Sequence, residues 1–357
     1  MKPVIVLSIA LLAALLVIPA SSIYYSWTGG EGCARCHEIR PPYEDWHAST
    51  HRGVACKSCH GDSMSLDVKF HAGNLRRLLK HAGGNVPEQV RIKDADVDAI
   101  MERCRACHRQ EFAQWQAGPH SITYAGIFLD RDHNSKRLLM DDCLRCHGMY
   151  FEGAIKELVT PIDITGPWRL TDAAQGRRPV IPCLACHSMH RRGNPMTKPA
   201  AKPASPGPAQ EVSRPSLAYF DRREMEHVPV SRMSEPAMLE GARRVKMSPD
   251  PRQMLCYQCH APTAGFQVGT GDDRTPIGVH EGLSCLACHQ KHAQMTRASC
   301  ANCHPRLSNC GLDVEKMDTT YLSAASKHNV HFVKCADCHP KGVPKKRETA
   351  VAERKAE

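Results

Sequence analysis

The sequence predicts a mostly α and irregular fold, built from short helices and long irregular connections with little β structure, behind one apolar N-terminal segment. Three observations predict this architecture. The 357 residues include 19 cysteines and 21 histidines, and most of these recur at one fixed spacing. Aromatic residues make up only 5% of the chain, too few for a conventional side-chain core. Residues 4–18 are apolar apart from Ser8, which predicts a helix at the N-terminus.

The fixed spacing is Cys-x-x-Cys-His, which occurs nine times and uses 18 of the 19 cysteines. The copies are numbered motif 1 to motif 9 in chain order. On one helical turn the two cysteines share a face, where their sulfurs can form thioethers to one haem, and the histidine projects beneath the iron. A zinc ribbon or a disulfide framework explains paired cysteines but gives no reason for a histidine after every pair. The pattern therefore predicts nine covalently bound haem c groups, with the short helices packed around them.

The motifs assign two roles residue by residue. The cysteines predicted to form thioethers are Cys33, Cys36, Cys56, Cys59, Cys104, Cys107, Cys143, Cys146, Cys183, Cys186, Cys256, Cys259, Cys285, Cys288, Cys300, Cys303, Cys335 and Cys338. The histidines predicted to be proximal iron ligands are His37, His60, His108, His147, His187, His260, His289, His304 and His339. No catalytic residue is assigned. Cys310 has no partner cysteine, and we expect it to be an inert thiol.

The net charge of +10 does not indicate nucleic-acid binding once the haems are included. Two propionates on each of nine haems add roughly −18, and nine ferric haem cores add roughly +9, so the oxidised holoprotein is close to neutral. We therefore interpret the excess of lysine and arginine as partners of the propionates, and no nucleic-acid partner is predicted.

Residues 1–27 predict either an uncleaved membrane anchor or a signal peptide. Ala20-x-Ser22 is an acceptable cleavage site for a secreted form that ends in the periplasm or beyond. From Val4 to Tyr25 there are 22 residues, about 33 Å as a helix, which is enough to span a bilayer. Aromatic residues that follow the apolar run suit the far interface of a membrane. We favour the anchor, which places the protein at the cytoplasmic membrane facing the periplasm.

Motif spacing divides the rest of the chain. Five motifs form a first group and four form a second, and the proline-rich stretch between them has the composition of an extended spacer. The alternative is one continuous haem stack wrapped by a long loop. Residues 96–104 are the clearest helical run. The predicted segments are 1–27 anchor or signal peptide, 28–194 pentahaem lobe, 195–250 Pro-rich linker or irregular, 251–340 tetrahaem lobe and 341–357 charged tail.

Twelve histidines lie outside the motifs and are candidates for the second axial ligand of each iron. Three short patterns occur twice: Trp-x4-His, His-x-Gly-x-x-Cys, and Cys-Leu-Ala-Cys-His-x-x-His. Position in these repeats, or just before motif 9, predicts six distal ligands: His51, His120, His190, His280, His292 and His331. Less support exists for His71, His81, His133, His227 and His328, and His47 is interpreted as a bystander. Haems with two protein ligands carry electrons and bind no substrate.

The N-terminal part resembles a known family. An apolar segment, then Gly32-Cys33-Ala-Arg-Cys36-His37, then Trp46-His-Ala-Ser-Thr-His51-Arg-Gly-Val-Ala-Cys56, is similar to the NapC/NirT/NrfH family of membrane-anchored multihaem quinol dehydrogenases. The resemblance covers about residues 1–60. It implies that quinol gives electrons to the first haem, which passes them to a periplasmic partner. NrfH-type members use a Met two residues after the first motif as an iron ligand, but this chain has Ile39 there, so the resemblance leaves the axial ligand of haem 1 open.

The sequence thus predicts an electron-transfer protein of anaerobic respiration rather than a substrate-converting enzyme, with quinol dehydrogenase as the activity to test. Its expected donor is the membrane quinone pool or a membrane redox partner, and its expected acceptor is a periplasmic cytochrome or reductase. One alternative is a catalytic multihaem oxidoreductase of the nitrite or hydroxylamine type, although no Cys-x-x-Cys-Lys motif occurs. Another is an exported cytochrome that forms filaments, so oligomerisation stays open.

Overall fold

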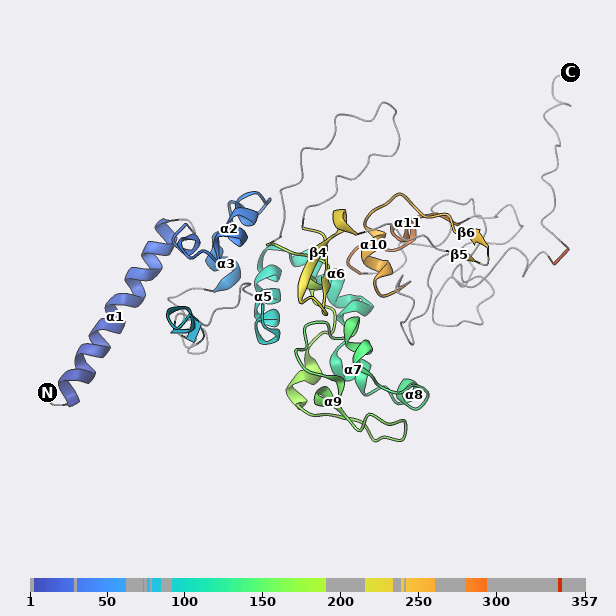
Figure 1. Cartoon of the computed structure of the whole chain (residues 1–357), viewed down its shortest axis with the longest axis horizontal. Helices are drawn as coiled ribbons and strands as arrows, with labels where there is room; N and C mark the ends of the chain where they lie inside the picture. Colours follow the sequence, from blue (N-terminus) through green and yellow to red (C-terminus); the bar gives the residue numbers. More distant parts are fainter. Residues whose placement is uncertain are drawn as a thin grey trace, which may run out of the picture. The chain divides into compact units, whose positions relative to one another are not determined.

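The computed structural model describes about three-fifths of the chain, drawn in colour in Figure 1. The described residues are 3–28, 31–61, 73, 76–77, 79–84, 92–190, 216–233, 239–240, 242–260, 280–293 and 340–341. Motif 8, motif 9 and several other sites of the sequence analysis lie outside the described residues, namely His71, Cys310, His328 and His331.

The chain divides into two compact units. The first consists of Met1–Ser234 together with His292–Gln294, and the second of Glu235–Lys291 with Met295–Glu357. The first unit contains motifs 1 to 5, and the second contains motifs 6 to 9. The predicted boundaries of the pentahaem and tetrahaem lobes stay predictions, because much of residues 195–250 and 251–340 lies outside the described part.

Helices and irregular segments dominate the described residues, as predicted. The α-helices are α1 (Pro3–Trp27), α2 (Arg40–His47), α3 (Cys56–His60), α5 (Asp94–Cys107), α6 (Arg109–Ala117), α7 (Tyr124–Phe128), α8 (Arg131–Asn134), α9 (Ile155–Leu158), α10 (Gln253–Tyr257) and α11 (Cys285–Cys288). Shorter 3₁₀ turns are η1 (Cys33–Arg35), η2 (Pro119–Ser121), η3 (Asp141–Arg145), η4 (Ala173–Arg177), η5 (Cys183–Ala185) and η6 (Val230–Arg232).

The described strands form three small antiparallel pairs. Strand β1 (Val159–Thr160) pairs with β2 (Arg169–Leu170), β3 (Ala218–Asp221) with β4 (Glu226–Pro229), and β5 (Leu239–Glu240) with β6 (Arg243–Arg244). The β3–β4 hairpin lies inside the stretch that the sequence predicts as linker or irregular. Its Tyr219 and Phe220 are buried, so this part of the stretch packs within the first unit.

Helix α1 is the longest helix of the described residues, with 25 residues. Many of its apolar side chains are exposed, among them Val4, Leu7 and Ile23, each 69% exposed, and Trp27, 85% exposed. Within the described residues, no helix qualifies by length and apolarity as a membrane span. The anchor over residues 1–27 therefore stays a prediction.

A side-chain core surrounds motif 4. Its buried members come from η3, α7, α9, β1 and the segments between them: Tyr124, Phe128, Leu139, Leu144, Ile155, Leu158, Val159 and Val180. Leu144 stands between the two cysteines of the motif and is completely buried. The low aromatic content predicts that porphyrins supply much of the core. Around motif 4, however, aliphatic and aromatic side chains already form a packed cluster.

Helix α5 carries motif 3 at its C-terminal end, and its sequence explains why it forms. Asp94 and Asp96 lie in the first turn, where carboxylates interact favourably with the unpaired N–H groups of the helix. Val97 and Met101 are four residues apart, so they share one face, and both are buried. The helix agrees with the helical run predicted over residues 96–104 and extends it at both ends.

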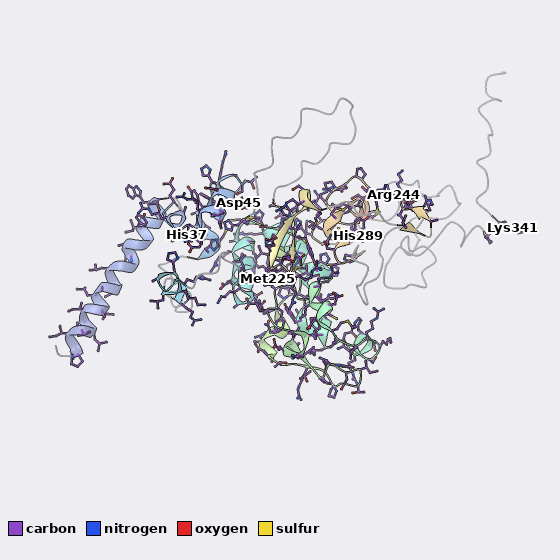
Figure 2. All side chains as sticks on the ribbon, in the orientation of Figure 1. His37, Asp45, Met225, Arg244, His289 and Lys341 are labelled. Carbon is purple, nitrogen blue, oxygen red and sulfur yellow. The ribbon has the colours of Figure 1, made fainter. Side chains whose placement is uncertain are left out.

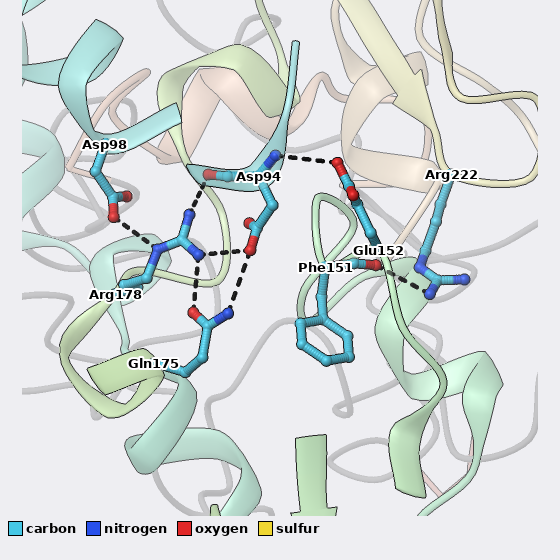
Figure 3. A network of polar contacts seen from close by, with 7 residues as sticks. All are labelled: Asp94, Asp98, Phe151, Glu152, Gln175, Arg178 and Arg222. Carbon is cyan, nitrogen blue, oxygen red and sulfur yellow. Dashed lines mark hydrogen bonds and ion pairs between the residues drawn. The ribbon is translucent and has the colours of Figure 1, made fainter. Parts of the chain in front are cut away.

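One arginine joins α5 to the segment that leads into motif 5 (Figure 3). The guanidinium of Arg178 donates to Asp94 Oδ2 at 2.6 Å and to Asp98 Oδ2 at 2.6 Å. It also donates to the side chain of Gln175 at 2.8 Å. The side chains of Arg178 and Asp94 are only 17% and 14% exposed, so little water competes for these contacts. Motif 3 and motif 5 are therefore held in one part of the first unit.

Removing this cation is expected to destabilise the first unit. We expect Arg178→Ala to lower the free energy of unfolding by about 2–3 kcal/mol, because Asp94 is left as a largely buried carboxylate without its ion pair. The matched control is Arg223→Ala, since Arg223 is 76% exposed and lies 3.5 Å from Asp221. That change is expected to cost about 0.5 kcal/mol or less. Urea denaturation of both variants measures the difference, and equal losses would contradict the role of Arg178.

Candidate haem sites

Each described motif lies on a single helical turn. Motif 1 begins at η1, motif 2 forms α3, motif 3 ends α5, and motifs 4, 5, 6 and 7 lie on η3, η5, α10 and α11. In five of them the histidine N–H donates to the carbonyl of the first cysteine at 2.8–3.1 Å. This hydrogen bond closes the helical turn, and from that turn both sulfurs and the imidazole can reach one porphyrin. His37 of motif 1 and His289 of motif 7 are labelled in Figure 2.

Several motif cysteines carry thiols in weakly hydrated surroundings, whereas Cys36, Cys107 and Cys288 are exposed. None of the thirteen cysteine side chains that the structure describes is oxidised to a disulfide. Burial raises the pKa of Cys183 to about 12 and that of Cys186 to about 11. Burial also raises the pKa values of Cys59, Cys104 and Cys143. These thiols are uncharged at pH 7, and their apolar surroundings suit the edge of a porphyrin.

Motifs 2, 3 and 5 come together in the first unit. Helix α3 packs against α5, and α5 packs against η5. Arg103, next to motif 3, donates from Nη1 to the carbonyl of Cys59 in motif 2 at 2.8 Å. The Cys104 thiol interacts electrostatically with the thiols of Cys59 and Cys183. The attachment points of three haems are therefore neighbours, although their motifs are far apart in the sequence.

A similar arrangement occurs in the second unit, where α10 packs against α11. A hydrogen bond between the thiols of Cys256 and Cys285 lowers the pKa of Cys285, so motifs 6 and 7 present sulfurs to each other. Glu281 fixes the loop before motif 7, because it accepts two bonds from Arg243, at 2.9 and 2.6 Å, and one from the N–H of Lys246 at 2.8 Å.

Four pairs of histidine rings lie at the separation that a shared iron requires. Two imidazoles bound on opposite sides of one metal, with bonds of about 2 Å, have ring centroids roughly 6 Å apart. The centroid distances in the first unit are 5.9 Å for His37 and His81, 6.0 Å for His51 and His108, 5.8 Å for His60 and His190, and 6.3 Å for His187 and His292. Each pair contains one motif histidine and one histidine from outside the motifs. The residues therefore fit haems held between two imidazoles.

Comparison with known families agrees with this geometry. Residues 103–159 match the family described as cytochrome c554 and c-prime, and residues 239–305 match the family described as cytochrome c7 and related cytochrome c. The two matched regions contain five of the nine motifs. The chain is a multihaem c-type cytochrome. No curated protein and no solved structure gives a significant match to this cytochrome.

The two matched regions exclude residues 1–60 of the cytochrome, so the resemblance to the NapC/NirT/NrfH family stays a prediction. Electron transfer by covalently bound haem c is what the matched families support. Nine haems, the quinol donor and the periplasmic location go beyond these matches and are argued below as proposals.

His190 has the hydrogen bond that an iron ligand needs. Its Nδ1 lies 2.8 Å from the carbonyl oxygen of Pro42, which only accepts, so Nδ1 carries the proton and Nε2 keeps its lone pair for a metal. Desolvation lowers the pKa values of both His190 and its partner His60. Both rings are therefore neutral at pH 7, which is the form that coordinates iron.

The pair at motif 1 differs from the others because an acid lies between its rings. Glu38 Oε1 is 3.2 Å from Nε2 of His37 and 3.0 Å from Nδ1 of His81, and the Glu38 side chain is only 6% exposed. Imidazoles bind metals through such a nitrogen, so Glu38 contacts His37 at an atom that iron would use. Ile39 left the axial ligand of haem 1 open, and the structure brings His81 and Glu38 beside His37. Neither has a repeat in the sequence that would have identified it.

The remaining predicted distal ligands of the cytochrome have different outcomes. His120 lies in η2 and His280 lies five residues before α11, and both stay predictions. His227 serves the fold instead: its Nε2 donates to the carbonyl of Leu184 at 2.7 Å and lies 3.2 Å from the hydroxyl of Tyr150. This contact fixes the backbone inside motif 5.

The repeated tryptophans anchor the chain just before two motifs of the cytochrome. Trp46 donates from Nε1 to the carbonyl of Val54 at 3.1 Å, and Trp115 donates to that of Ile181 at 3.0 Å. Each carbonyl lies two residues before the first cysteine of a motif, motif 2 and motif 5 respectively. The sequence analysis used Trp-x4-His only to find histidines. The structure shows that the tryptophan positions the backbone that enters a haem motif.

This anchor makes a testable contribution to stability. We expect Trp115→Phe to lower the free energy of unfolding of the cytochrome by about 1–2 kcal/mol, because the Ile181 carbonyl loses its donor in a site where Trp115 is 8% exposed. Trp168→Phe is the matched control, since Trp168 makes the same kind of bond to Asp163 at 2.9 Å in an exposed loop. Its expected cost is about 0.5 kcal/mol or less. Thermal or urea unfolding followed by haem absorbance checks both, and a larger loss for Trp168→Phe would refute the assignment.

Proposed function

We propose that the cytochrome carries nine covalently bound haem c groups and transfers electrons from the membrane quinone pool, or from another membrane redox partner, to a periplasmic cytochrome or reductase. The observation that carries the proposal is the set of four imidazole pairs at 5.8–6.3 Å. An iron with two protein ligands has no position for a substrate, so its chemistry is electron transfer.

Close packing of the attachment sites supports transfer between haems. The sulfurs of motifs 2, 3 and 5 are neighbours in the first unit, and those of motifs 6 and 7 are neighbours in the second. Haems attached at neighbouring sites must therefore lie close to each other. The chain supplies attachment, axial ligands and a weakly hydrated environment, and the haem iron supplies the change of oxidation state.

The exposed apolar surface of α1 supports attachment to the cytoplasmic membrane. Burial of apolar surface stabilises by about 25 cal/mol per Å², so a helix that exposes valine, leucine and isoleucine side chains along its length gains from contact with lipid. Motif 1 begins at Cys33, six residues after α1 ends at Trp27. In the proposed arrangement, haem 1 is therefore the one nearest the membrane and receives electrons from quinol.

The haem count provides the first test. We expect nine haems per chain, measured as the ratio of pyridine haemochrome to protein and as the mass of the intact holoprotein. The double change Cys183→Ala/Cys186→Ala should remove one haem, because both thioethers of motif 5 are lost. Cys310→Ser should keep all nine, since Cys310 belongs to no motif. A wild-type count below nine, or loss of a haem from Cys310→Ser, would refute the assignment.

The donor is tested in membranes. A short-chain quinol is expected to reduce the haems of membrane-bound cytochrome, followed by visible absorbance, and dithionite measures the total that can be reduced. Leu11→Lys/Leu12→Lys should release the protein from the membrane pellet, because each charge near the centre of a membrane helix costs about 2.5–3.5 kcal/mol. Reduction by dithionite but not by any quinol would exclude the quinol donor. Retention of the lysine variant in the membrane would exclude anchoring by α1.

A further inference from the structure

The imidazole pairs assign ligands to particular haems. We propose that haem 2 is bound by His60 and His190, and haem 3 by His108 and His51, so that shared ligand segments join haem 2 to both haem 3 and haem 5. The proposal rests on the proposed function, in which these motifs hold haems.

Residues 51–60 form a segment that serves two haems. His60 belongs to motif 2, and its ring lies 5.8 Å from that of His190. His51, nine residues earlier, lies 6.0 Å from His108 of motif 3. Because one short segment supplies an imidazole to each of two irons, haems 2 and 3 are held side by side. Arg103, which bonds to the carbonyl of Cys59, joins the same two motifs through the backbone.

Residues 187–190 serve two haems in the same way. His187 is the histidine of motif 5, and His190 pairs with His60 of motif 2. The bond from His190 Nδ1 to Pro42 fixes the ring so that its other nitrogen faces away from the backbone partner. Haem 5 is therefore held beside haem 2. Motifs 3 and 5 are also neighbours, because α5 packs against η5, so the three haems belong to one cluster.

The histidine pairs also explain the repeated sequence at motifs 5 and 7. The pattern Cys-Leu-Ala-Cys-His-x-x-His occurs at motif 5 and at motif 7, and its last histidine is His190 in one copy and His292 in the other. His190 pairs with the histidine of motif 2, and His292 pairs with His187 of motif 5. In both copies the last histidine reaches the haem of an earlier motif rather than its own. The last histidine of the repeat thus serves a haem other than the one on its own motif.

Ferric EPR and visible spectra of the purified holoprotein test the assignment. His190→Ala is expected to convert one haem of nine from low spin to high spin, and added imidazole is expected to restore it. His47→Ala is the matched control, because His47 is an exposed ring that contacts Tyr43 and Trp46. It should leave every haem as in the wild type. An unchanged spectrum for His190→Ala would overturn the proposal.

Removal of single haems identifies which iron is affected. In a background that lacks haem 2, made by Cys56→Ala/Cys59→Ala, His190→Ala should add no further high-spin haem. In a background that lacks haem 5, made by Cys183→Ala/Cys186→Ala, it should still add one. The opposite pattern would assign His190 to haem 5 and overturn the proposed ligand assignment. If the alanine variant does not fold, His190→Met gives the same readout, because a His/Met haem has a distinct spectrum and a raised potential.

These measurements are independent of the electron donor. They record the ligation of each iron in purified ferric protein without quinol or acceptor. A failure of quinol to reduce the cytochrome would remove the proposed donor and leave the ligand assignment standing. A wrong ligand assignment would leave haem attachment and quinol oxidation standing.

Discussion

The interaction on which the rest of this structure depends is the pairing of two imidazoles from distant parts of the chain, which we propose hold one haem iron between them. A motif fixes a haem to its own turn, but this alone holds nothing else in place. The second imidazole joins that turn to a segment up to about 130 residues away, as His60 and His190 show. Closing such loops removes conformational freedom from the unfolded chain, in the way that a disulfide does. The paired histidines that would bind the haems are therefore also contacts that hold distant segments of the chain together.

Side-chain packing supplements these connections unevenly. Around motif 4, eight buried residues form a conventional core, and the completely buried Leu144 places the motif inside it. Near motifs 2 and 5, by contrast, single polar contacts hold the backbone: Trp46 to Val54, and Trp115 to Ile181. A cluster of apolar side chains stabilises the fold in proportion to the area that it buries. One hydrogen bond to a carbonyl contributes less free energy but fixes the orientation of the backbone. Apolar packing therefore stabilises the core around motif 4, and single hydrogen bonds orient the backbone that leads into motifs 2 and 5.

Local features of the fold could be predicted from the sequence, and long-range ones only in part. Cys-x-x-Cys-His and the helix over Asp94–Cys107 depend on residues within four positions of one another, so their spacing is sufficient. His51, His190 and His292 were predicted as distal ligands because their surroundings recur. His81 was only a weaker candidate and Glu38 was not identified, since their relation to His37 exists only after the chain has folded. The β3–β4 hairpin was hidden for a similar reason, because proline-rich composition nearby describes a spacer but not the strands that follow it.

Chain length explains why the same segments serve twice. Past the first 32 residues the sequence provides about 36 residues for each of the nine motifs, too few to build a separate domain around every haem. If each haem took both ligands from its own neighbourhood, only contacts such as those of Arg103 and Arg178 would connect one site with the next. Two histidines three positions apart, as in His187 and His190, serve two sites, because one belongs to the local motif and the other pairs with the histidine of a second motif. Dense motifs and shared ligand segments thus suit each other, and in the proposed function the same short spacing brings the haems close enough to exchange electrons.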